Sequence, residues 1–418
     1  MATEIREIED RDLDAFIRLQ IDAYPGLGMI YERDREKLRQ RIAERRQDVR
    51  VTLYGSYRGN RLVGCMRVHD YRMNFRGALV AAGGLGGVAV DLTVKREGVA
   101  GGMVRFYLDK YAAAGAPMAV LWPFRPDFYR KMGFGYGGKK YRYTILPETL
   151  PHAAGKGHLA HGEERDFAAM TRCHNRLLAL RTGMLDETEL SLRQTVGAAG
   201  GGRAVVYRDG REVRGFMVYR FRPGAPGNFV SNDLCVEECL YESPEVLAEF
   251  LAFLHSQRDQ VRRVILDLPD PNFHYAPVDP RNGSEGLYAS VYHEVAACAV
   301  GPMYRVLDVQ SLLAAASEAK FGPGEATVAF TLADRWWGKT AGTTAIHFCE
   351  GRAAAAPKRK CDVAVEMEVA DFSSVILGAV RLSQLVDYGL ARVSKRKSAE
   401  VVDSILAAAQ PPYCFSRF

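Results

Sequence analysis

A pattern that occurs twice constrains the fold of this 418-residue chain more than any other feature. Residues 207–218 repeat, with one inserted residue, the turn and the apolar alternation of residues 57–68, and each pattern predicts a β-hairpin. Each hairpin is followed by a predicted strand, a helix and a further strand in the same order. We therefore predict an internal duplication of one folded unit.

The predicted duplication divides the chain into three domains. The first covers residues 1–150, and a segment rich in Gly, His and Ala at 152–162 opens the second, which covers residues 151–300. The third covers residues 301–418 and carries predicted strands and helices of its own. Since helices precede the first hairpin and also alternate with strands, the predicted fold class is α+β, with α/β character.

Composition excludes several classes of protein. Lys plus Arg number 56 and Asp plus Glu number 50, so the net charge of +6 is too thinly spread for a nucleic-acid binder. The eight cysteines form no Cys-x-x-Cys pair, and we expect no metal site. No apolar run is long enough for a membrane span or a signal peptide, so we expect a cytoplasmic protein with no membrane partner.

The segment from 87 to 114 contains the first candidate for chemistry. An apolar strand leads into Lys95-x-x-Gly98-x-Ala100, and a predicted helix follows at 103–114. Backbone N–H groups at the N-terminus of a helix, approached closely through a glycine, form a cradle for an anion such as a pyrophosphate. The spacing alone is also compatible with a plain strand-to-helix turn.

A second element makes the pattern more specific. A short strand at 118–122 is followed by Phe128-Tyr129-x-x-x-Gly133-Phe134. In this order, the elements resemble the GNAT superfamily of N-acetyltransferases, which use acetyl-CoA. The resemblance implies cofactor-binding residues of three kinds: strand residues that face the pantetheine, loop residues that hold the pyrophosphate, and residues near the pantetheine or thioester end. These are Val88, Ala89 and Val90; Lys95, Arg96, Glu97, Gly98, Val99, Ala100 and Gly101; and Phe124 and Arg125.

The second copy lacks the features of this loop. Its corresponding residues, 239–245, include no glycine and carry two acids, Glu242 and Glu245, which would repel a pyrophosphate. We predict that the second domain is degenerate and does not bind CoA.

Two GNAT-like units followed by a different α+β unit resemble the Eis (enhanced intracellular survival) family of N-acetyltransferases. The resemblance implies a third domain like sterol carrier proteins and a homohexamer. It also implies that Tyr129 is the general acid and that the C-terminal carboxylate, borne here by Phe418, is the general base. These roles suit amine acetylation, because the amine must lose a proton and the departing thiolate benefits from a donor.

Other interpretations of the same residues stay open. Tyr129 is one of twenty tyrosines, most of which serve packing, and a terminal Phe418 can be a core anchor. The family acetylates aminoglycosides at several positions, but Arg417 beside the proposed base disfavours a polycation. The alternatives are a protein-lysine acetyltransferase and a non-catalytic protein that binds CoA or an apolar ligand.

Overall fold

The computed structural model describes residues 3–196, 201–225, 227–283, 286–416 and 418, and the chain divides into two compact units. The first unit comprises Met1–Gly137, Pro302–Pro412 and Ser416–Phe418. The second comprises Gly138–Gly301 and Tyr413–Phe415. Both units therefore contain segments that lie far apart in the sequence.

A seven-stranded sheet organises the first unit, in the order β1-β2-β3-β4-β5-β16-β6. Only the pair β4–β5 is parallel, and the other neighbours are antiparallel. The strands are β1 (Glu4–Glu7), β2 (Val51–Arg58), β3 (Arg61–Phe75), β4 (Ala78–Val90), β5 (Met118–Leu121), β6 (Gly135–Tyr136) and β16 (Met303–Val306).

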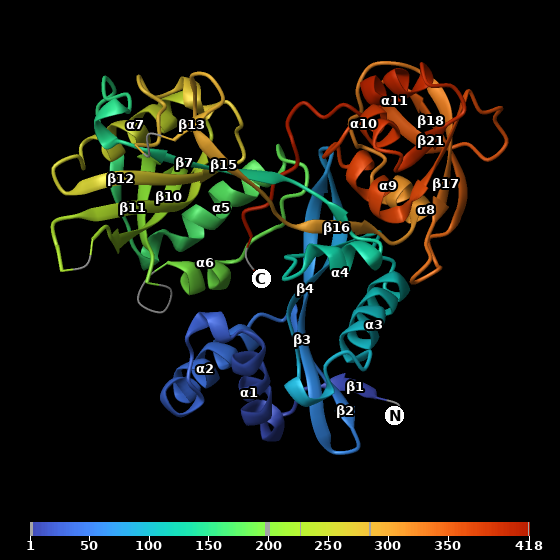
Figure 1. Ribbon diagram of the computed structural model, residues 1–418, viewed down its shortest axis with the longest axis horizontal. Helices are drawn as coiled ribbons and strands as arrows, with labels where there is room; N and C mark the ends of the chain where they lie inside the picture. The colour runs from blue at the N-terminus through green and yellow to red at the C-terminus, as the bar shows by residue number, and fades with distance from the viewer. Residues whose placement is uncertain (1–2, 197–200, 226, 284–285, 417) are drawn as a thin grey trace. The chain divides into compact units, whose positions relative to one another are not determined.

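Helices cover both faces of this sheet (Figure 1). Helix α3 (Val99–Ala113) buries Met103, Val104 and Tyr107 against one face. Helices α1 (Leu13–Ala23) and α2 (Tyr31–Arg46) belong to the core of the opposite face. The short helix α4 (Pro126–Lys131) connects β5 to β6. Successive residues of β3 therefore point into different cores, as the period of a strand requires.

The second unit contains a seven-stranded sheet in the order β15-β7-β12-β11-β10-β9-β8. Strands β8 to β12 repeat the order of β1 to β5, including the parallel pair β11–β12, which confirms the predicted duplication. The elements are β7 (Lys139–Ile145), β8 (Leu159–Gly162), β9 (Arg203–Asp209), β10 (Glu212–Pro223), β11 (Asn232–Tyr241), β12 (Val261–Leu268), β15 (Ala296–Val300), the hairpin β13 (Leu287–Tyr288) and β14 (Tyr292–His293), and helices α5 (Phe167–Leu178), α6 (Glu189–Thr195) and α7 (Pro244–His255).

The sixth strand of each sheet comes from an unexpected part of the chain. Strand β7 follows β6 in sequence, yet it pairs with β12 and β15. Strand β16 follows β15 in sequence, yet it lies between β5 and β6. Each of the two sheets thus contains a strand that directly follows a strand of the other sheet in the sequence.

The third part of the chain folds around a five-stranded sheet, in the order β19-β18-β17-β20-β21. Its elements are β17 (Ala326–Ala333), β18 (Gly342–Cys349), β19 (Arg352–Ala355), β20 (Val363–Glu368), β21 (Ala391–Val393), α8 (Val309–Ala315), α9 (Val369–Ile376), α10 (Leu382–Asp387) and α11 (Ser398–Leu406). Across all the described residues, no helix has both the length and the apolar character needed to cross a bilayer.

A buried ion pair anchors β16 in the first unit. The side chains of Arg305 and Asp334 are 0% and 1% exposed, and Arg305 Nη2 donates to Asp334 Oδ2 over 2.7 Å. Arg305 Nη1 donates to the carbonyl of Met132, and the guanidinium lies 5.1 Å from the centre of the Trp337 ring. Removing one member of such a pair leaves the other charge buried without compensation.

We predict that Arg305→Leu lowers the free energy of unfolding by about 3–5 kcal/mol, because it strands the Asp334 carboxylate in the core. Chemical denaturation followed by circular dichroism measures the loss. Arg335→Leu is the matched control, since Arg335 pairs with Glu368 over 3.1 Å but its side chain is 86% exposed. The control should change stability by less than about 1 kcal/mol. Equal midpoints for the two variants would contradict the prediction.

Candidate active site

The pairing of strands β4 and β5 ends part-way along β4, near the middle of the first sheet. Their last paired residues are Leu85 and Leu121, whereas β4 continues to Val90. On its other side β4 is irregular, because Gly86 pairs with Arg67 and Ala89 pairs with Cys65, so β4 has one more residue than β3 between these pairs. Gly87 lies in this bulge with φ +58°, a left-handed conformation that favours glycine.

Two side chains, one from α1 and one from the residue that follows it, hold the bulge. Gln20 Nε2 donates to the carbonyl of Gly87 over 2.6 Å, and the Tyr24 hydroxyl donates to the carbonyl of Val88 over 2.8 Å. Among the strand residues expected to face pantetheine, Val88 therefore has a carbonyl that already accepts a hydrogen bond within the chain. Sequence reasoning missed both side chains, because they lie far from the bulge along the chain.

The loop before α3 has the form expected of an anion site. Lys95, Arg96, Glu97 and Gly98 are all exposed, and Gly98, with φ +84°, caps the helix that begins at Val99. The first amides of a helix have no partner inside it and lie at its positive end. Arg58 Nη1 bonds the Glu97 carboxylate over 2.6 Å, which neutralises the acid of this loop. These features fit a pyrophosphate.

The corresponding loop of the second unit does not fit one. Helix α7 begins with Pro244, which offers no N–H. Glu242, two residues earlier, pairs with Arg176 over 2.7 Å and with Arg214 over 3.3 Å. Arg176 and Arg214 thus already bond a carboxylate of the chain itself.

Tyr129 lies in α4 and is 6% exposed. Its ring packs edge-on against Phe128 and Phe134, with centroids 5.2 and 6.0 Å apart. Burial, and next the neighbouring Tyr24 hydroxyl, raise the pKa of Tyr129 above its usual value of 10. The phenol is therefore protonated at neutral pH and can donate a hydrogen bond.

Gly133, the glycine of the Phe-Tyr-x-x-x-Gly-Phe element, is needed for a steric reason. Its φ is +83°, and a Cβ at this position would stand 1.6 Å from Arg305 Nη1. The motif glycine thus gives the buried arginine room next to the end of α4.

Phe124 and Arg125 follow β5 and are both exposed. The Phe124 ring meets the Tyr24 ring edge-on at 5.7 Å, which puts it near the bulge. Arg125 Nη2 bonds Asp127 over 2.5 Å. Of the two, Phe124 is connected to the bulge, through its contact with Tyr24.

The carboxyl group of Phe418 lies against the bulge. A Cβ at Gly86 would stand 2.8 Å from the Phe418 carboxyl carbon and 3.2 Å from Arg67 Nη2, so only glycine leaves room for both. The Phe418 ring packs against His69 and Tyr71, with centroids 5.4 and 5.2 Å apart.

A further contact secures the tail. Trp122 Nε1 donates to the carbonyl of Ser416 over 2.9 Å. Trp122 comes directly after β5, at the point where β5 parts from β4, and sequence reasoning gave it no role. Arg417 lies outside the described residues.

Sequence reasoning also missed a row of hydrogen-bonded side chains beside Phe418, formed by Arg67, His69 and Tyr71. Arg67 Nε donates to His69 Nε2 over 2.8 Å, so the ring proton of a neutral His69 sits on Nδ1, 3.3 Å from the Tyr71 hydroxyl. Burial first, and then the charges of Arg67, Arg45 and Arg50, lower the pKa of His69 well below 6.5. The sequence did contain a signal for this contact, since residues 65, 67, 69 and 71 alternate along one predicted strand and should therefore share a face.

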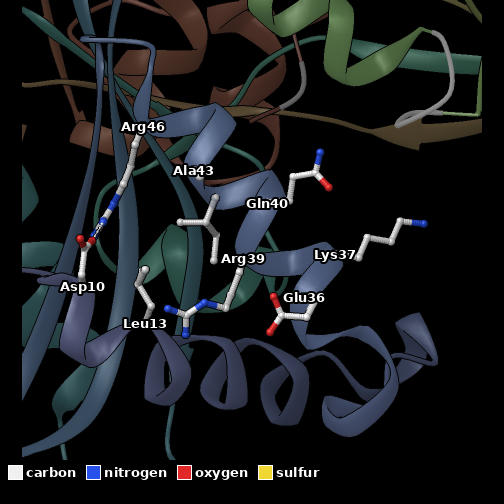
Figure 2. A pocket seen from close by; sticks show the side chains of 9 residues that line it. Asp10, Leu13, Glu36, Lys37, Arg39, Gln40, Ala43 and Arg46 are labelled. Atoms are coloured by element: carbon white, nitrogen blue, oxygen red, sulfur yellow. Dashed lines mark hydrogen bonds and ion pairs between the residues drawn. The ribbon is translucent and has the colours of Figure 1, made fainter.

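The first unit also contains a cavity of about 780 Å³ between the start of α1 and α2 (Figure 2). Its lining is mostly charged, and Arg46 crosses it to bond Asp10 over 2.5 Å. None of the residues predicted for catalysis or CoA binding lines this cavity.

Comparison with known proteins agrees with this architecture. Models of the acetyltransferase (GNAT) domain match residues 4–137 and 183–306, more than half of the chain together, and a sterol carrier protein domain model matches residues 309–415. The chain belongs to the GNAT acetyltransferases. It is an N-acetyltransferase of this superfamily, whose domains use acetyl-CoA.

Individual proteins share similarity beyond the matched domains. An uncharacterized N-acetyltransferase of Streptomyces coelicolor is 27% identical over 351 residues, 79% of each chain. Another, of Streptomyces avermitilis, is 31% identical over 138 residues, 33% of this chain and 32% of that one. Eis1 from Mycobacterium abscessus and a GCN5-related N-acetyltransferase from Kribbella flavida share the fold over 100% of both chains, with a TM-score of 0.77 each and identities of 19% and 22%. The predicted α+β fold, with the domain order of an Eis-like acetyltransferase, is confirmed.

We predict that His69 makes this GNAT protein less stable in acid. The unfolded chain takes up a proton near pH 6.5 while folded His69 does not, so stability is retained above that pH and lost as the pH falls below it. The loss approaches about 1.4 kcal/mol per pH unit. His69→Gln should reduce this slope between pH 6.5 and 5 in denaturation curves, whereas the exposed His161→Gln should keep it. An unchanged slope in His69→Gln would contradict the assignment.

Proposed function

We propose that the first domain transfers an acetyl group directly from acetyl-CoA to a primary amine, with Tyr129 as general acid and the Phe418 carboxylate as general base. One observation carries the proposal: the Phe418 carboxyl group packs on Gly86, at the point where β4 leaves β5. Tyr24 connects this bulge to Tyr129 and Phe124.

CoA recognition in this proposal uses the exposed loop and strand β4. Lys95 and Arg96 supply positive charge, and the amides of Val99, Ala100 and Gly101 open α3. Gly98 supplies the left-handed turn that brings the chain close to the phosphates, and Glu97 is neutralised by Arg58. When bound, acetyl-CoA supplies the activated acetyl thioester. Val88, Ala89, Val90, Phe124 and Arg125 would flank its pantetheine arm.

The base needs little intrinsic strength. An alkylammonium has a pKa near 10 and an α-carboxyl group one near 3.5, so the ammonium loses its proton to water, and the Phe418 carboxylate orients the neutral amine. As the C–N bond forms, the nitrogen becomes strongly acidic, and the carboxylate then takes its proton. Arg67 Nη2 lies beside the same glycine, which puts a guanidinium group near the carboxylate.

Tyr129 acts on the opposite side of the reaction. As the C–S bond breaks, its hydroxyl donates to the sulfur, whose thiol has a pKa of about 8.5. Because burial raises the pKa of Tyr129, the hydroxyl is always protonated when the sulfur leaves. The net result moves one proton from the amine to the thiol, and no covalent enzyme intermediate is needed.

The charges around the proposed base bear on the acceptor. Arg67, Arg45 and Arg50 all act on His69, next to the Phe418 ring. This environment favours a compact acceptor with one amine over a polycation such as an aminoglycoside. A protein lysine is the alternative acceptor. A non-catalytic protein that binds CoA or an apolar ligand is the alternative from another class, and calorimetry with acetyl-CoA distinguishes it.

The remaining assignments follow the same resemblance. We propose residues 1–150 as the catalytic domain, 151–300 as a degenerate domain without CoA, and 301–418 as the domain that ends in the base. A homohexamer and a cytoplasmic location stay predictions. Light scattering in solution measures the first.

We predict that Tyr129→Phe lowers kcat for acetyl transfer at least about 100-fold while the Kd for acetyl-CoA stays unchanged, since only the donor is lost. Acetyl-CoA consumption against monoamines, aminoglycosides and lysine peptides first identifies the acceptor and then measures kcat. Tyr136→Phe is the matched control, because Tyr136 is near in sequence but exposed. A wild-type kcat in Tyr129→Phe would show that Tyr129 is not the general acid.

We also predict that Gly86→Ala lowers kcat at least about tenfold, because the new Cβ would collide with the Phe418 carboxyl group at 2.8 Å. One glycine added after Phe418 should act similarly by moving the carboxylate. Gly157→Ala is the control, since a Cβ there has no neighbour within 4 Å. Thermal melting and acetyl-CoA calorimetry check that each variant is folded and binds. Wild-type kcat in both altered chains would exclude Phe418 as the base.

A further inference from the structure

Three side chains with metal-binding atoms meet at one end of the third sheet. Strands β17 and β18 pair antiparallel, with Ala326 opposite Phe348 and Thr327 opposite His347. The same register continued by one residue puts Glu325 opposite Cys349. Because alternate residues of a strand share a face, Glu325, Thr327, His347 and Cys349 lie on one face, opposite the buried Phe348.

The ligand atoms of three of these residues converge. A carboxylate oxygen of Glu325, a ring nitrogen of His347 and the Cys349 sulfur all lie within 4.8 Å of one another. Glu325 Oε1 is 3.6 Å from His347 Nε2. Two ligands about 2.0 Å from one zinc ion in tetrahedral geometry stand about 3.3 Å apart, so small side-chain rotations complete the site.

The histidine is already oriented for this role. His347 Nδ1 lies 3.1 Å from the Thr327 hydroxyl, which can accept its ring proton. In that tautomer Nε2 keeps a free lone pair, directed toward Glu325. A hydrogen bond from the second ring nitrogen is the usual way in which proteins fix a metal-binding histidine.

The chemistry of the set selects the metal. A thiolate, an imidazole and a carboxylate together suit Zn²⁺, whereas Mg²⁺ and Ca²⁺ prefer oxygen alone. The thiolate and the carboxylate balance the charge of the ion. Arg352 is a cation close to the cluster, because it lies opposite Cys349 on β19. Its charge is balanced by Glu318, which it bonds over 3.1 Å. Glu325 is exposed, so water can reach a fourth coordination position.

We propose that Glu325, His347 and Cys349 bind one Zn²⁺ ion on the third domain. The site goes beyond the acetyl transfer proposed above and does not depend on it. It also departs from the expectation of no metal, which considered spacings along the chain; here Glu325 reaches the other two ligands only through strand pairing.

The test uses the full chain, freed of metal by a chelator. Calorimetry with Zn²⁺ should show one ion per chain, and Co²⁺ should produce a thiolate-to-metal absorption band. Cys349→Ser and His347→Gln should each weaken Zn²⁺ binding at least about tenfold. Cys349→Ser should also abolish the band. Circular dichroism verifies that both variants are folded.

Cys361→Ser is the matched control, because Cys361 is an exposed cysteine of the same domain outside the cluster. It should keep wild-type affinity and the full absorption band. No saturable Zn²⁺ binding to the wild-type chain would overturn the proposal. So would wild-type affinity in Cys349→Ser, or an equal loss of affinity in Cys361→Ser.

Discussion

The pairing of β16 with β5 and β6 is the interaction on which the rest of the first unit depends. It completes the sheet, and it carries Arg305 into the core, where the guanidinium bonds Asp334 and the carbonyl of Met132. The same side chain fills the space beside Gly133, at the end of the helix that bears Tyr129. A residue from late in the chain thus sets the position of the proposed acid.

The two acetyltransferase domains share a strand order but differ at the helix start that we propose binds the pyrophosphate in the first. Both contain a parallel strand pair followed by an antiparallel sixth strand. The difference lies in a few residues at one helix start. Gly98 opens an exposed, basic turn in the first domain, whereas Glu242 holds the nearby arginines in the second. Charge and backbone freedom at this point, rather than topology, separate the two domains.

Much of the fold could be predicted because its signals are local. Turn residues and apolar alternation predicted both hairpins, and the position of Gly98 between a strand and a helix predicted the anion loop. The placement of β7 and β16 could not be predicted, because a strand's pattern does not name its partner. Gln20 and Tyr24 were missed for a related reason, because they bond strand residues that lie far away in the sequence. The contacts of His69 are local, with residues two positions away on its own strand, and their signal was overlooked. The position of Phe418 was expected only from family resemblance.

The placement of β16 also dictates an order of events during synthesis. Strand β5 emerges from the ribosome long before residues 303–306, which cover its edge. At a translation rate of about 5–20 residues per second, the edge of β5 stays unpaired for on the order of ten seconds or more. Its free backbone N–H and C=O groups can meanwhile pair with a strand of another chain. The nascent first domain must therefore wait, incomplete, until the whole second domain has been translated.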